Sequence, residues 1–424
     1  MYKLVIEGGH KLAGEVSISG AKNSALPIMA ASILIEDDVI IDNVPNLEDV
    51  KTLSQLLDKL GKKVEFSNNR MVISTVSEEE FEAPYEITKK IRASIAVLGP
   101  LLAKRRKAKV SFPGGCAIGP RPVDLHIKGI RVLGASVKIE HGYIIAEAQR
   151  LTGGLVNMLG INGTSVVATE NIMMAATLAE GTTVIDNAAM EPEVVDLANF
   201  LIKCGAKIKG HGTNTIIVEG VKKLKGCEYK IIPDRIETGT FILAGMMTNG
   251  EILIKDCEPN HLTEPIRVFK EMGADIQITS KNTISVKGKE KYEPANVTTL
   301  PYPYFPTDLQ AQLMAVLTKA KGISVITEKI FQNRFMHAYE MNRLGADITI
   351  DGTLAVIKGV EKLYGAPVMA SDLRGGAGLI IALLGAEGTG ELLRVYHVDR
   401  GYEKIEEKLS KLGGKVKRER TNLI

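Results

Sequence analysis

Two kinds of hydrophobic pattern alternate along this chain, and the alternation occurs six times. In each repeat a segment rich in alanine is apolar on nearly all sides, which predicts a helix that is covered all round. A β-branched run such as Val39–Ile41 or Thr183–Ile185 usually follows and predicts a strand. The six predicted helices are Ala25–Leu34, Ala93–Ala103, Ile172–Ala179, Phe241–Met247, Ala311–Thr318 and Ala377–Gly385.

A short signature of the form Leu-Gly-Ala-x-apolar, or a close variant, closes a second helical segment in each repeat. Its glycines are Gly61, Gly134, Gly205, Gly273, Gly345 and Gly413, at spacings of 73, 71, 68, 72 and 68 residues. A glycine just past a helix commonly adopts the left-handed conformation that ends the helix. One repeat therefore consists of helix, strand, helix, glycine, strand and strand.

Six such units suit two domains of three repeats each, because a typical domain holds roughly 100–200 residues. Helices that are apolar all round need cover on every side, so we expect the helices inside and the sheets outside. The predicted fold class is α/β, an inside-out α/β barrel built from βαβαββ-like repeats.

Composition excludes several classes of protein. The 424 residues are 45% hydrophobic and 24% charged, which argues against disorder, collagen and a membrane bundle. Lysine and arginine exceed the acidic residues by only 53 − 50 = 3, too few to indicate a nucleic-acid or acidic-membrane partner. The N-terminus has no signal-peptide pattern and the run Ala377–Ala386 is too short to span a membrane. The four cysteines form no CxxC pair, so a reduced, cytoplasmic protein without a metal cluster is expected.

Polar residues recur where the predicted helices begin. The first helix of each repeat starts near a polar residue: Lys22, Arg92, Ser165, Arg235, Asp308 and Arg374. In three repeats the second helix starts near an arginine: Arg121, Arg334 and Arg400. In the other three repeats it starts near Glu48, Pro192 and Asn260. A helix N-terminus carries partial positive charge, so a basic residue there is unfavourable unless an anion is close. Matched positions in six repeats therefore predict a shared anion-binding cleft. The alternative is that each residue caps its helix or forms a local ion pair.

The second repeat contains a loop rich in glycine and proline, SFPGGCAIGPRPVDLH, with Cys116 at its tip. Most free cysteines are small buried hydrophobes, and Cys204 and Cys257 fit that description. Glycine neighbours instead leave Cys116 exposed. Nearby cations such as Lys22 and Arg121 would favour its thiolate, whereas a bound anionic substrate would favour the thiol. The hypothesis is a general acid that is protonated when substrate is present.

Asp308 lies in the segment PYPYFPTDLQAQ, next to Thr307. One interpretation is that both residues cap the helix that follows. The other is that the carboxylate accepts a proton from a substrate hydroxyl, because a neighbouring phosphate would raise the pKa of the carboxyl group.

Several segments together resemble the UDP-N-acetylglucosamine 1-carboxyvinyltransferases, a branch of the enolpyruvyl transferase family. They are SGAKNSALP (19–27), IRASIAVLGPLLA (91–103), PGGCAIGPRPVDLH (113–126), PDRIETGTF (233–241), FPTDLQAQ (305–312), NRFMH (333–337), SDLR (371–374) and YHVDRGYE (396–403). The resemblance implies one domain of residues 22–232 and one of residues 1–21 with 233–424, with the active site in the cleft between them. It implies a cytoplasmic enzyme of peptidoglycan synthesis, and hence of cell shape and division, without a cofactor or metal.

The implied reaction transfers the enolpyruvyl group of phosphoenolpyruvate to the 3′-hydroxyl of the sugar nucleotide through a tetrahedral intermediate, with release of phosphate. In this comparison Cys116 resembles the proton donor, the site of a covalent phosphoenolpyruvate adduct and the target of fosfomycin. Lys22, Arg121 and Arg400 resemble phosphate ligands, Arg334 and Arg374 carboxylate ligands, Asn23 a ligand of the intermediate, and Asp308 the base. The nucleotide-sugar contacts match Arg92, Arg121, Pro122, Val123, Asp124, Leu125, Ser165, Val166, Asp308 and Ile330, and the supporting residues match His126 and Asp372.

Some positions depart from the family pattern. Asn162, Gly163 and Thr164 lack a lysine that some members have there, Val167 stands where glycine is usual, and Tyr304 replaces a usual glycine. Gly375 and Gly378 replace larger residues, so we expect the helix after Arg374 to be loosened by roughly 1 kcal/mol for each glycine.

Three alternatives remain open at this point. The first is the enolpyruvyl transferase that acts on shikimate 3-phosphate, which has no equivalent of the Cys116 loop. The second is a non-catalytic paralogue that only binds a nucleotide sugar, which the presence of Cys116, Asp308 and Arg400 disfavours. The third is a nucleic-acid-binding module, supported only by the short runs KRRK (104–107) and KVKRER (415–420), which lack interleaved aromatic residues.

Overall fold

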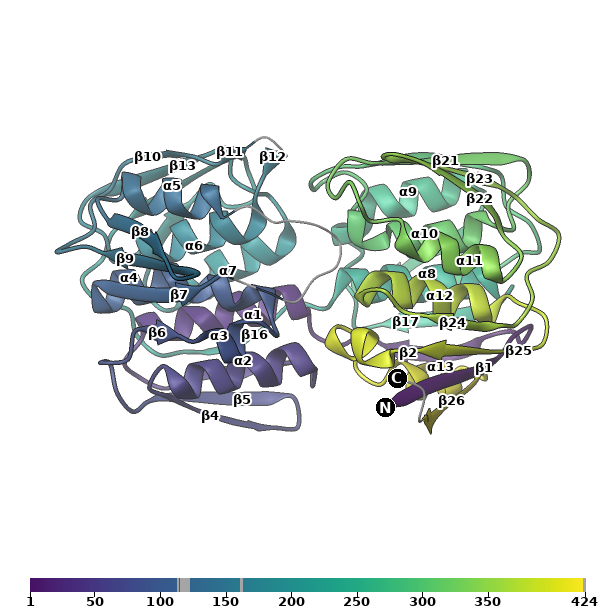
Figure 1. Ribbon diagram of the computed structural model, residues 1–424, viewed down its shortest axis with the longest axis horizontal. Helices are drawn as coiled ribbons and strands as arrows, with labels where there is room; N and C mark the ends of the chain where they lie inside the picture. Colours follow the sequence, from purple (N-terminus) through teal and green to yellow (C-terminus); the bar gives the residue numbers. More distant parts are fainter. Residues whose placement is uncertain (113, 115–122, 161–162, 422–424) are drawn as a thin grey trace. The chain divides into compact units, whose positions relative to one another are not determined.

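The computed structural model describes residues 1–112, 114, 123–160 and 163–421. Within it the chain divides into two compact units (Figure 1). One, the central unit, takes the described residues of 20–116 and 120–232. The other, the terminal unit, takes those of 1–19 and 233–424. Three sequence-predicted site residues, Cys116, Arg121 and Pro122, lie outside the described residues.

Three repeats build the central unit, each with an inner helix, a second helix and a four-stranded sheet. The inner helices are α1 (Lys22–Ala31) with η1 (Ser32–Leu34), η2 (Arg92–Val97) with α4 (Leu98–Arg105), and α6 (Val166–Ala176); the second helices are α2 (Glu48–Lys59), α5 (Asp124–Val132) and α7 (Pro192–Lys203). The strands of each sheet are given in the order in which they lie side by side. The first sheet is β16 (Glu228–Lys230), β3 (Val39–Asp42), β5 (Arg70–Thr75) and β4 (Lys62–Ser67), and the second is β6 (Glu82–Ala83), β7 (Lys107–Ser111), β9 (Tyr143–Glu147) and β8 (Ser136–Glu140). The third is β10 (Leu155–Asn157), β13 (Thr182–Asp186), β15 (Thr215–Glu219) and β14 (Lys207–Lys209). A short helix α3 (Tyr85–Thr88) and the strand pair β11 (Leu159–Gly160) and β12 (Gly163–Thr164) complete it.

The terminal unit repeats this plan. Its inner helices are α8 (Arg235–Met247), η4 (Thr307–Leu309) with α10 (Gln310–Leu317), and α12 (Leu373–Leu384), and its second helices are α9 (Thr263–Glu271) after η3 (Pro259–Leu262), α11 (Met336–Arg343), and α13 (Ile405–Lys411) after η5 (Val395–Arg400). The sheets are β2 (Ala13–Ser17), β17 (Glu251–Lys255), β19 (Thr283–Lys287), β18 (Asp275–Ser280); β20 (Asn296–Thr299), β21 (Ile323–Glu328), β23 (Leu354–Lys358), β22 (Asp347–Asp351); and β24 (Pro367–Met369), β25 (Thr389–Leu393), β1 (Tyr2–Glu7), β26 (Lys415–Arg420).

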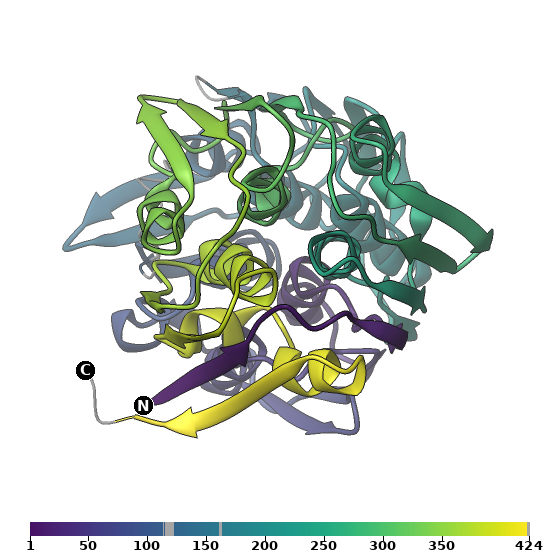
Figure 2. The same cartoon turned by 90° about the vertical axis from the view of Figure 1, so that its right-hand side faces the viewer.

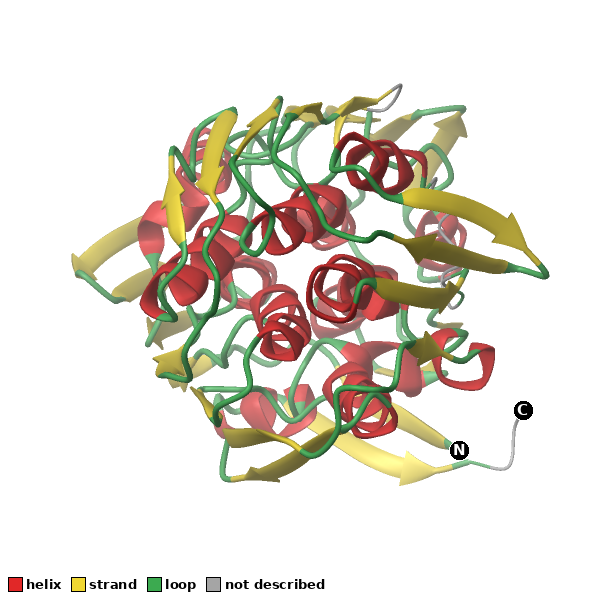
Figure 3. Cartoon of the chain, turned by 90° about the vertical axis from the view of Figure 1, so that its left-hand side faces the viewer, coloured by secondary structure: helices red, strands yellow, loops and turns green. Residues whose placement is uncertain are grey.

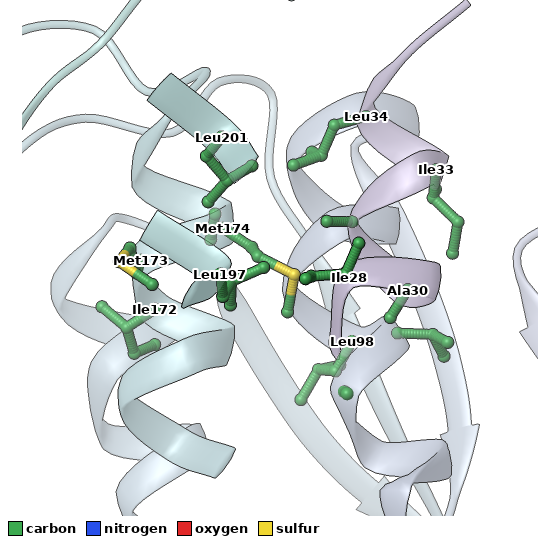
Figure 4. Packing of buried hydrophobic residues seen from close by; sticks show 14 of the residues in the cluster. Ile28, Ala30, Ile33, Leu34, Leu98, Ile172, Met173, Met174, Leu197 and Leu201 are labelled. Carbon is green, nitrogen blue, oxygen red and sulfur yellow. The ribbon is translucent and has the colours of Figure 1, made fainter. Parts of the chain in front are cut away.

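The inner helices fill the middle of each unit and the sheets lie outside them. Figure 2 shows this for the terminal unit and Figure 3 for the central unit. Every residue of α8 and of α10 is buried, as expected of helices that are apolar on all sides. In the central unit Ile28, Leu98 and Met174 come from three different inner helices and lie in one packed cluster (Figure 4). The predicted inside-out arrangement is confirmed.

All six signature glycines adopt positive φ angles, from 79° at Gly61 to 103° at Gly205. In five of the repeats the residue after the glycine donates its backbone N–H to the carbonyl five positions earlier, as Ala206 does to Leu201 at 2.9 Å. This hydrogen bond ends a helix in the Schellman manner, and glycine adopts the required conformation without steric cost. The predicted helix ends are therefore confirmed.

One strand of each sheet was not predicted. Each four-stranded sheet has a short edge strand that pairs in parallel with its neighbour, as β16 does with β3 and β24 does with β25. In the sixth repeat β1 lies between β25 and β26, and Ile6 pairs with both Gly390 and Val416. The two ends of the chain thus complete one sheet. Five of these six edge strands have only two to four residues, and β2 has five, so each carries too short a pattern to recognise in sequence.

Within the described residues, no helix combines the length and the apolar character that crossing a membrane would require.

Candidate active-site residues

The inner helices begin where the sequence predicted them to begin. Lys22, Arg92 and Arg235 are the first residues of α1, η2 and α8. Ser165 is the N-cap of α6, Asp308 lies in η4 ahead of α10, and Arg374 is the second residue of α12. Six repeats therefore place a polar side chain at the same structural position.

Asp308 is held between two arginines in the terminal unit. Its Oδ1 lies 2.8 Å from Nη1 of Arg334, and its Oδ2 lies 3.0 Å from Nη2 and 3.1 Å from Nε of Arg374. Both arginines are almost fully buried, whereas the Asp308 side chain keeps 26% exposure. Three residues far apart in the sequence thus form one cluster with a net charge of +1.

Arg374 is positioned by contacts with Asp308 and Tyr402. Burial is the largest single influence and would lower the pKa of its guanidinium, but Asp308, Tyr402 and Asp234 together raise the pKa, so the group stays charged. Its guanidinium carbon also lies 5.4 Å from the ring centroid of Tyr402, within cation–π range. One nitrogen, Nη1, is buried without a hydrogen-bond partner among the described residues.

A buried polar network contacts the backbone carbonyl of Asp308. The amide Nε2 of Gln312 donates to the Asp308 carbonyl at 2.9 Å and to the Tyr402 hydroxyl at 3.0 Å. The Tyr402 hydroxyl also lies 2.9 Å from Oγ1 of Thr240. The sequence interpretation missed these three residues, although each lies inside one of the quoted segments, because nothing in a single sequence shows that they meet.

The start of α12 is capped by Asp372. Its Oδ1 accepts the backbone N–H groups of Arg374 and Gly375, each at 3.0 Å. Burial would raise the pKa of Asp372, but the charge of Arg334 and the Gly375 N–H outweigh it and lower the pKa. The carboxylate thus stays charged and fixes the backbone of the residue that carries the guanidinium.

The two unusual glycines of α12 do not simply loosen the helix, as we expected from the sequence. A Cβ on Gly378 would lie 2.6 Å from the carbonyl oxygen of Ala311 in α10, and one on Gly375 would lie 2.7 Å from Oδ2 of Asp372. Such contacts are too short for a real side chain. Gly378 therefore allows α12 to approach α10 closely, and Gly375 leaves room for the capping carboxylate of Asp372, which the sequence pattern could not reveal.

Glu328, fully buried at the end of β21, organises the loop that precedes Arg334. Its Oε1 accepts from the backbone N–H groups of Ile330 and Phe331 at 2.8 and 3.0 Å and from the Thr299 hydroxyl at 2.7 Å. Its Oε2 accepts from the Thr307 hydroxyl at 2.8 Å. The hydroxyl oxygen of Thr307 in turn accepts from Nη1 of Arg334 at 2.8 Å, so Thr307 links Glu328 to Arg334, one of the two arginines that hold Asp308.

Replacing Glu328 by glutamine is expected to lower the free energy of unfolding by about 1–3 kcal/mol. The glutamine side chain has one accepting oxygen, and its other terminal atom is an NH₂ group that donates. This NH₂ group would therefore face either the two backbone N–H groups or the Thr307 hydroxyl, which now donate to Glu328. Urea unfolding measures the change, and Glu251→Gln, at the exposed first residue of β17, is the matched control. Equal stability of Glu328→Gln and wild type would contradict the assigned role.

In the central unit Lys22 is paired with a carboxylate. Its Nζ lies 3.2 Å from Oδ2 of Asp49 at the start of α2, and both side chains are buried. The next residue, Asn23, is exposed. Glu48, which the sequence indicated as the start of α2, is the first residue of that helix, and Asp49 follows it.

His126 is held neutral by its partner. Asn171 in α6 donates through Nδ2 to the Ile95 carbonyl at 2.8 Å, and the same amide nitrogen lies 2.9 Å from Nδ1 of His126. The Oδ1 atom of Asn171 accepts the Gly99 N–H at 2.7 Å, which fixes the orientation of the Asn171 amide. Nδ1 must therefore act as an acceptor, and burial lowers the pKa of His126 to about 4. Asn171 thus links α6 to η2, α4 and α5 of the central unit.

This pairing predicts a loss of stability in mild acid. The pKa of His126 is about 4 in the folded protein and about 6.5 when unfolded, so the unfolded chain binds more protons between these values. Stability contributed by neutral His126 is present above pH 6.5 and falls as the pH drops towards 4. At pH 5 the expected loss from this side chain is about 2 kcal/mol.

The control variant is His126→Asn, whose Oδ1 replaces Nδ1 as the acceptor without titrating in this range. We expect its unfolding free energy to change less than that of wild type between pH 7.5 and pH 5. An identical pH dependence of both proteins would show that His126 is not the titrating group.

The other predicted site residues fall on both units. In the central unit Arg92, Ser165 and Val166 are half-buried at the starts of η2 and α6, Val123 caps α5, Asp124 is exposed and Leu125 is buried. In the terminal unit Ile330 and Arg400 are half-buried, and Arg400 ends η5. Of the departures, Gly163 and Thr164 form β12, Val167 packs against the core, and Tyr304 is exposed. Asn162 lies outside the described residues.

The alternative of local ion pairs accounts for three of the basic residues. Lys22 has Asp49, and Arg334 and Arg374 share Asp308, so protein carboxylates satisfy these charges in the structure. The shared cleft inferred from the sequence is therefore not needed to explain them. The net charge of the Asp308 cluster and the unpaired Nη1 of Arg374 nevertheless fit an additional anion.

Comparison with known proteins identifies the class. A sequence model described as "EPSP synthase (3-phosphoshikimate 1-carboxyvinyltransferase)" matches residues 6–409. In fold, the chain is similar to the enolpyruvyl transferase NikO from Streptomyces tendae, with a TM-score of 0.89, 24% identity and 98% of both chains covered. EPSP synthase from Acinetobacter baumannii gives a TM-score of 0.76 at 18% identity, covering 99% of this chain and 100% of the other. This chain belongs to the EPSP synthase family of enolpyruvyl transferases.

More similar relatives carry the name of one branch of that family. The "UDP-N-acetylglucosamine 1-carboxyvinyltransferase 1" of Caldanaerobacter subterraneus subsp. tengcongensis is 54% identical over 416 residues, covering 98% of this chain and 99% of the relative. The "UDP-N-acetylglucosamine 1-carboxyvinyltransferase 2" of Carboxydothermus hydrogenoformans is 52% identical, covering 99% of both chains. The resemblance noted in the sequence is thus confirmed.

Proposed function

We propose that this chain is an enzyme that transfers the enolpyruvyl group of phosphoenolpyruvate to the 3′-hydroxyl of UDP-N-acetylglucosamine and releases phosphate. The reaction is the first committed step of peptidoglycan synthesis. The observation that carries the proposal is the identity of 50–54% with enzymes of that name over nearly their whole length. Small-molecule substrates and a cytoplasmic location belong to the same proposal.

The side chains of the terminal unit supply chemistry that fits this reaction. In the proposed scheme Asp308 accepts the proton of the attacking hydroxyl, and Arg334 and Arg374 bind the substrate carboxylate. Planar guanidinium groups suit a carboxylate because they donate two parallel hydrogen bonds. Support comes from their burial beside Asp308 and from the free Nη1 donor of Arg374.

The arginines also suggest how the base becomes active. Two guanidinium groups stabilise the negative charge of Asp308 and so weaken it as a base. When an anionic substrate binds the same arginines, part of their charge is neutralised and the carboxylate holds a proton more readily. Proton transfer from the hydroxyl to Asp308 would thus be coupled to the presence of phosphoenolpyruvate.

In the central unit the proposed roles rest on the family resemblance and on helix-start geometry. Lys22 and Arg121 would bind phosphate together with Arg400, Asn23 the tetrahedral intermediate, and Cys116 would donate the proton to the methylene carbon. Buried Lys22 keeps Asp49 as its partner, so it would enter the reaction as part of a neutral pair. The sugar nucleotide would meet Arg92, Val123, Asp124, Leu125, Ser165 and Val166.

We further propose that the two units correspond to the two domains expected from the sequence, 22–232 and 1–21 with 233–424, and that residues of both act on the same substrates. His126 and Asp372 would serve as positioning residues, since each fixes a helix that carries proposed ligands.

Phosphate release tests the proposal. The purified chain is incubated with phosphoenolpyruvate and, separately, with UDP-N-acetylglucosamine or shikimate 3-phosphate. We expect release only with the sugar nucleotide, and a rate lowered by about 10²-fold or more in Cys116→Ser, as for loss of a general acid.

The other outcomes are equally informative. Release with shikimate 3-phosphate alone would assign the chain to the other enolpyruvyl transferase. Binding of the sugar nucleotide without any phosphate release would identify a binding paralogue. Full activity of Cys116→Ser would remove the proton-donor role from that residue while leaving the overall reaction assigned.

A further inference from the structure

Two cysteines unconnected with the proposed reaction lie side by side in the central unit. Cys204 is the residue that ends α7, and Cys227 directly precedes β16. Their sulfur atoms are 3.2 Å apart, and both are free thiols. Forming a disulfide bond, which is about 2.0 Å long, would require the two sulfurs to approach by about 1.2 Å.

The backbone around both cysteines is held in place, so the proximity is built into the fold. The Cys204 carbonyl accepts the N–H of Lys225 at 2.8 Å, and the Cys227 carbonyl accepts the N–H of Ile40 in β3 at 2.9 Å. Tyr229, two residues further on, donates its hydroxyl to Oδ1 of Asp196 at 2.6 Å. The strand that carries one thiol is thereby fixed to the helix that carries the other.

We propose that Cys204 and Cys227 form a peroxide-sensitive dithiol that closes to an intramolecular disulfide. The bridge would join the end of the third repeat to the sheet of the first, because β16 pairs with β3. It would therefore close the ring of three repeats covalently.

The chemistry assigns different roles to the two sulfurs. Cys227 is half-buried, whereas Cys204 is buried, so an oxidant in solution meets Cys227 first. The hydrogen bond with Cys204 lowers the pKa of Cys227, burial opposes this, and the charge of Lys203 adds to the lowering. The same contact and burial raise the pKa of Cys204. Cys227 is thus the attacking thiolate and Cys204 the resolving thiol.

The steps balance with hydrogen peroxide as the oxidant. The Cys227 thiolate attacks one peroxide oxygen, the O–O bond breaks, and a sulfenic acid and hydroxide form. The Cys204 sulfur then attacks the sulfenic sulfur, the S–S bond forms, and hydroxide leaves. The Cys204 proton passes to that hydroxide. Overall the two thiols lose two electrons and peroxide is reduced to two molecules of water.

The chain offers a direct readout, because trypsin places the two cysteines on different peptides. Cleavage after Lys203 and Lys207 yields residues 204–207, and cleavage after Lys225 and Lys230 yields residues 226–230. Full-length Cys116→Ala protein is oxidised with hydrogen peroxide, alkylated and digested with trypsin. Glutathione is added to the oxidation as an internal reference for the extent of thiol oxidation. We expect a cross-linked pair of these two peptides that disappears on reduction with dithiothreitol.

Two variants in the same background separate the roles. Cys204→Ala is expected to abolish the cross-linked pair and to leave Cys227 as a sulfenic acid that dimedone traps. Cys257→Ala is the matched control, since buried Cys257 has no thiol neighbour among the described residues, and it should leave the cross-link unchanged.

The proposal fails if both cysteines are recovered as thiols under conditions that oxidise the glutathione completely. It also fails if Cys227 is trapped by dimedone to the same extent with and without Cys204, because the neighbouring thiol would then not resolve it. Neither outcome bears on enolpyruvyl transfer, since the two cysteines have no part in that proposal.

Discussion

Asp308→Asn is expected to lower kcat by about 10²- to 10⁴-fold, the usual contribution of a general base, while binding of the sugar nucleotide stays measurable. Asparagine has the shape of aspartate but accepts no proton, and its amide group would face one of the two arginines that now contact Oδ1 and Oδ2. Phosphate release at saturating substrate and calorimetric titration with UDP-N-acetylglucosamine measure the two quantities.

Stability must be controlled, because the variant disturbs a partly buried ion cluster. Asp308→Ala removes the carboxylate that two buried guanidinium groups share, and breaking a buried ion pair in this way commonly costs about 3–5 kcal/mol. Unfolding curves of both variants therefore accompany the kinetics, with Asp347→Asn on exposed β22 as the matched control. Folded Asp308→Asn with wild-type turnover would contradict the assignment of the base.

The periodic features of the fold were accessible from sequence because local physics fixes them. Six glycines at nearly constant spacing mark helix ends that only a left-handed residue completes, and all six have positive φ. Helices that are apolar on every side have no stable place except the interior. The short parallel edge strands and the pairing of β1 with β26 depend on contacts between distant segments, which no local pattern encodes.

The positions of the candidate site residues were predicted better than their partners. Helix starts follow from the repeat, so the sequence alone places Arg374 and Asp308 at equivalent positions. That they contact each other depends on how α10 packs against α12, and that packing depends on Gly378. Gln312 looks like an ordinary helix residue and Tyr402 like an ordinary loop residue until the fold brings them together.

Arg374→Lys is expected to raise the KM for phosphoenolpyruvate by about 10- to 100-fold, with a smaller change in the KM for the sugar nucleotide. The guanidinium contacts Asp308 through Nε and Nη2, lies against the Tyr402 ring and keeps Nη1 for a further acceptor. A lysine keeps the charge but has one compact ammonium group, which cannot make these contacts at once. Steady-state kinetics with each substrate varied in turn measure the two constants.

The matched control is Arg343→Lys, an arginine more than half exposed at the end of α11 in the same unit. It should leave both KM values unchanged. If Arg374→Lys instead raises both KM values equally, the guanidinium acts through the fold of the cluster and not through the substrate carboxylate. The cluster would then hold Asp308 in place, and the free donor Nη1 would have no part in recognising phosphoenolpyruvate, which leaves Arg334 as the proposed carboxylate ligand of the terminal unit.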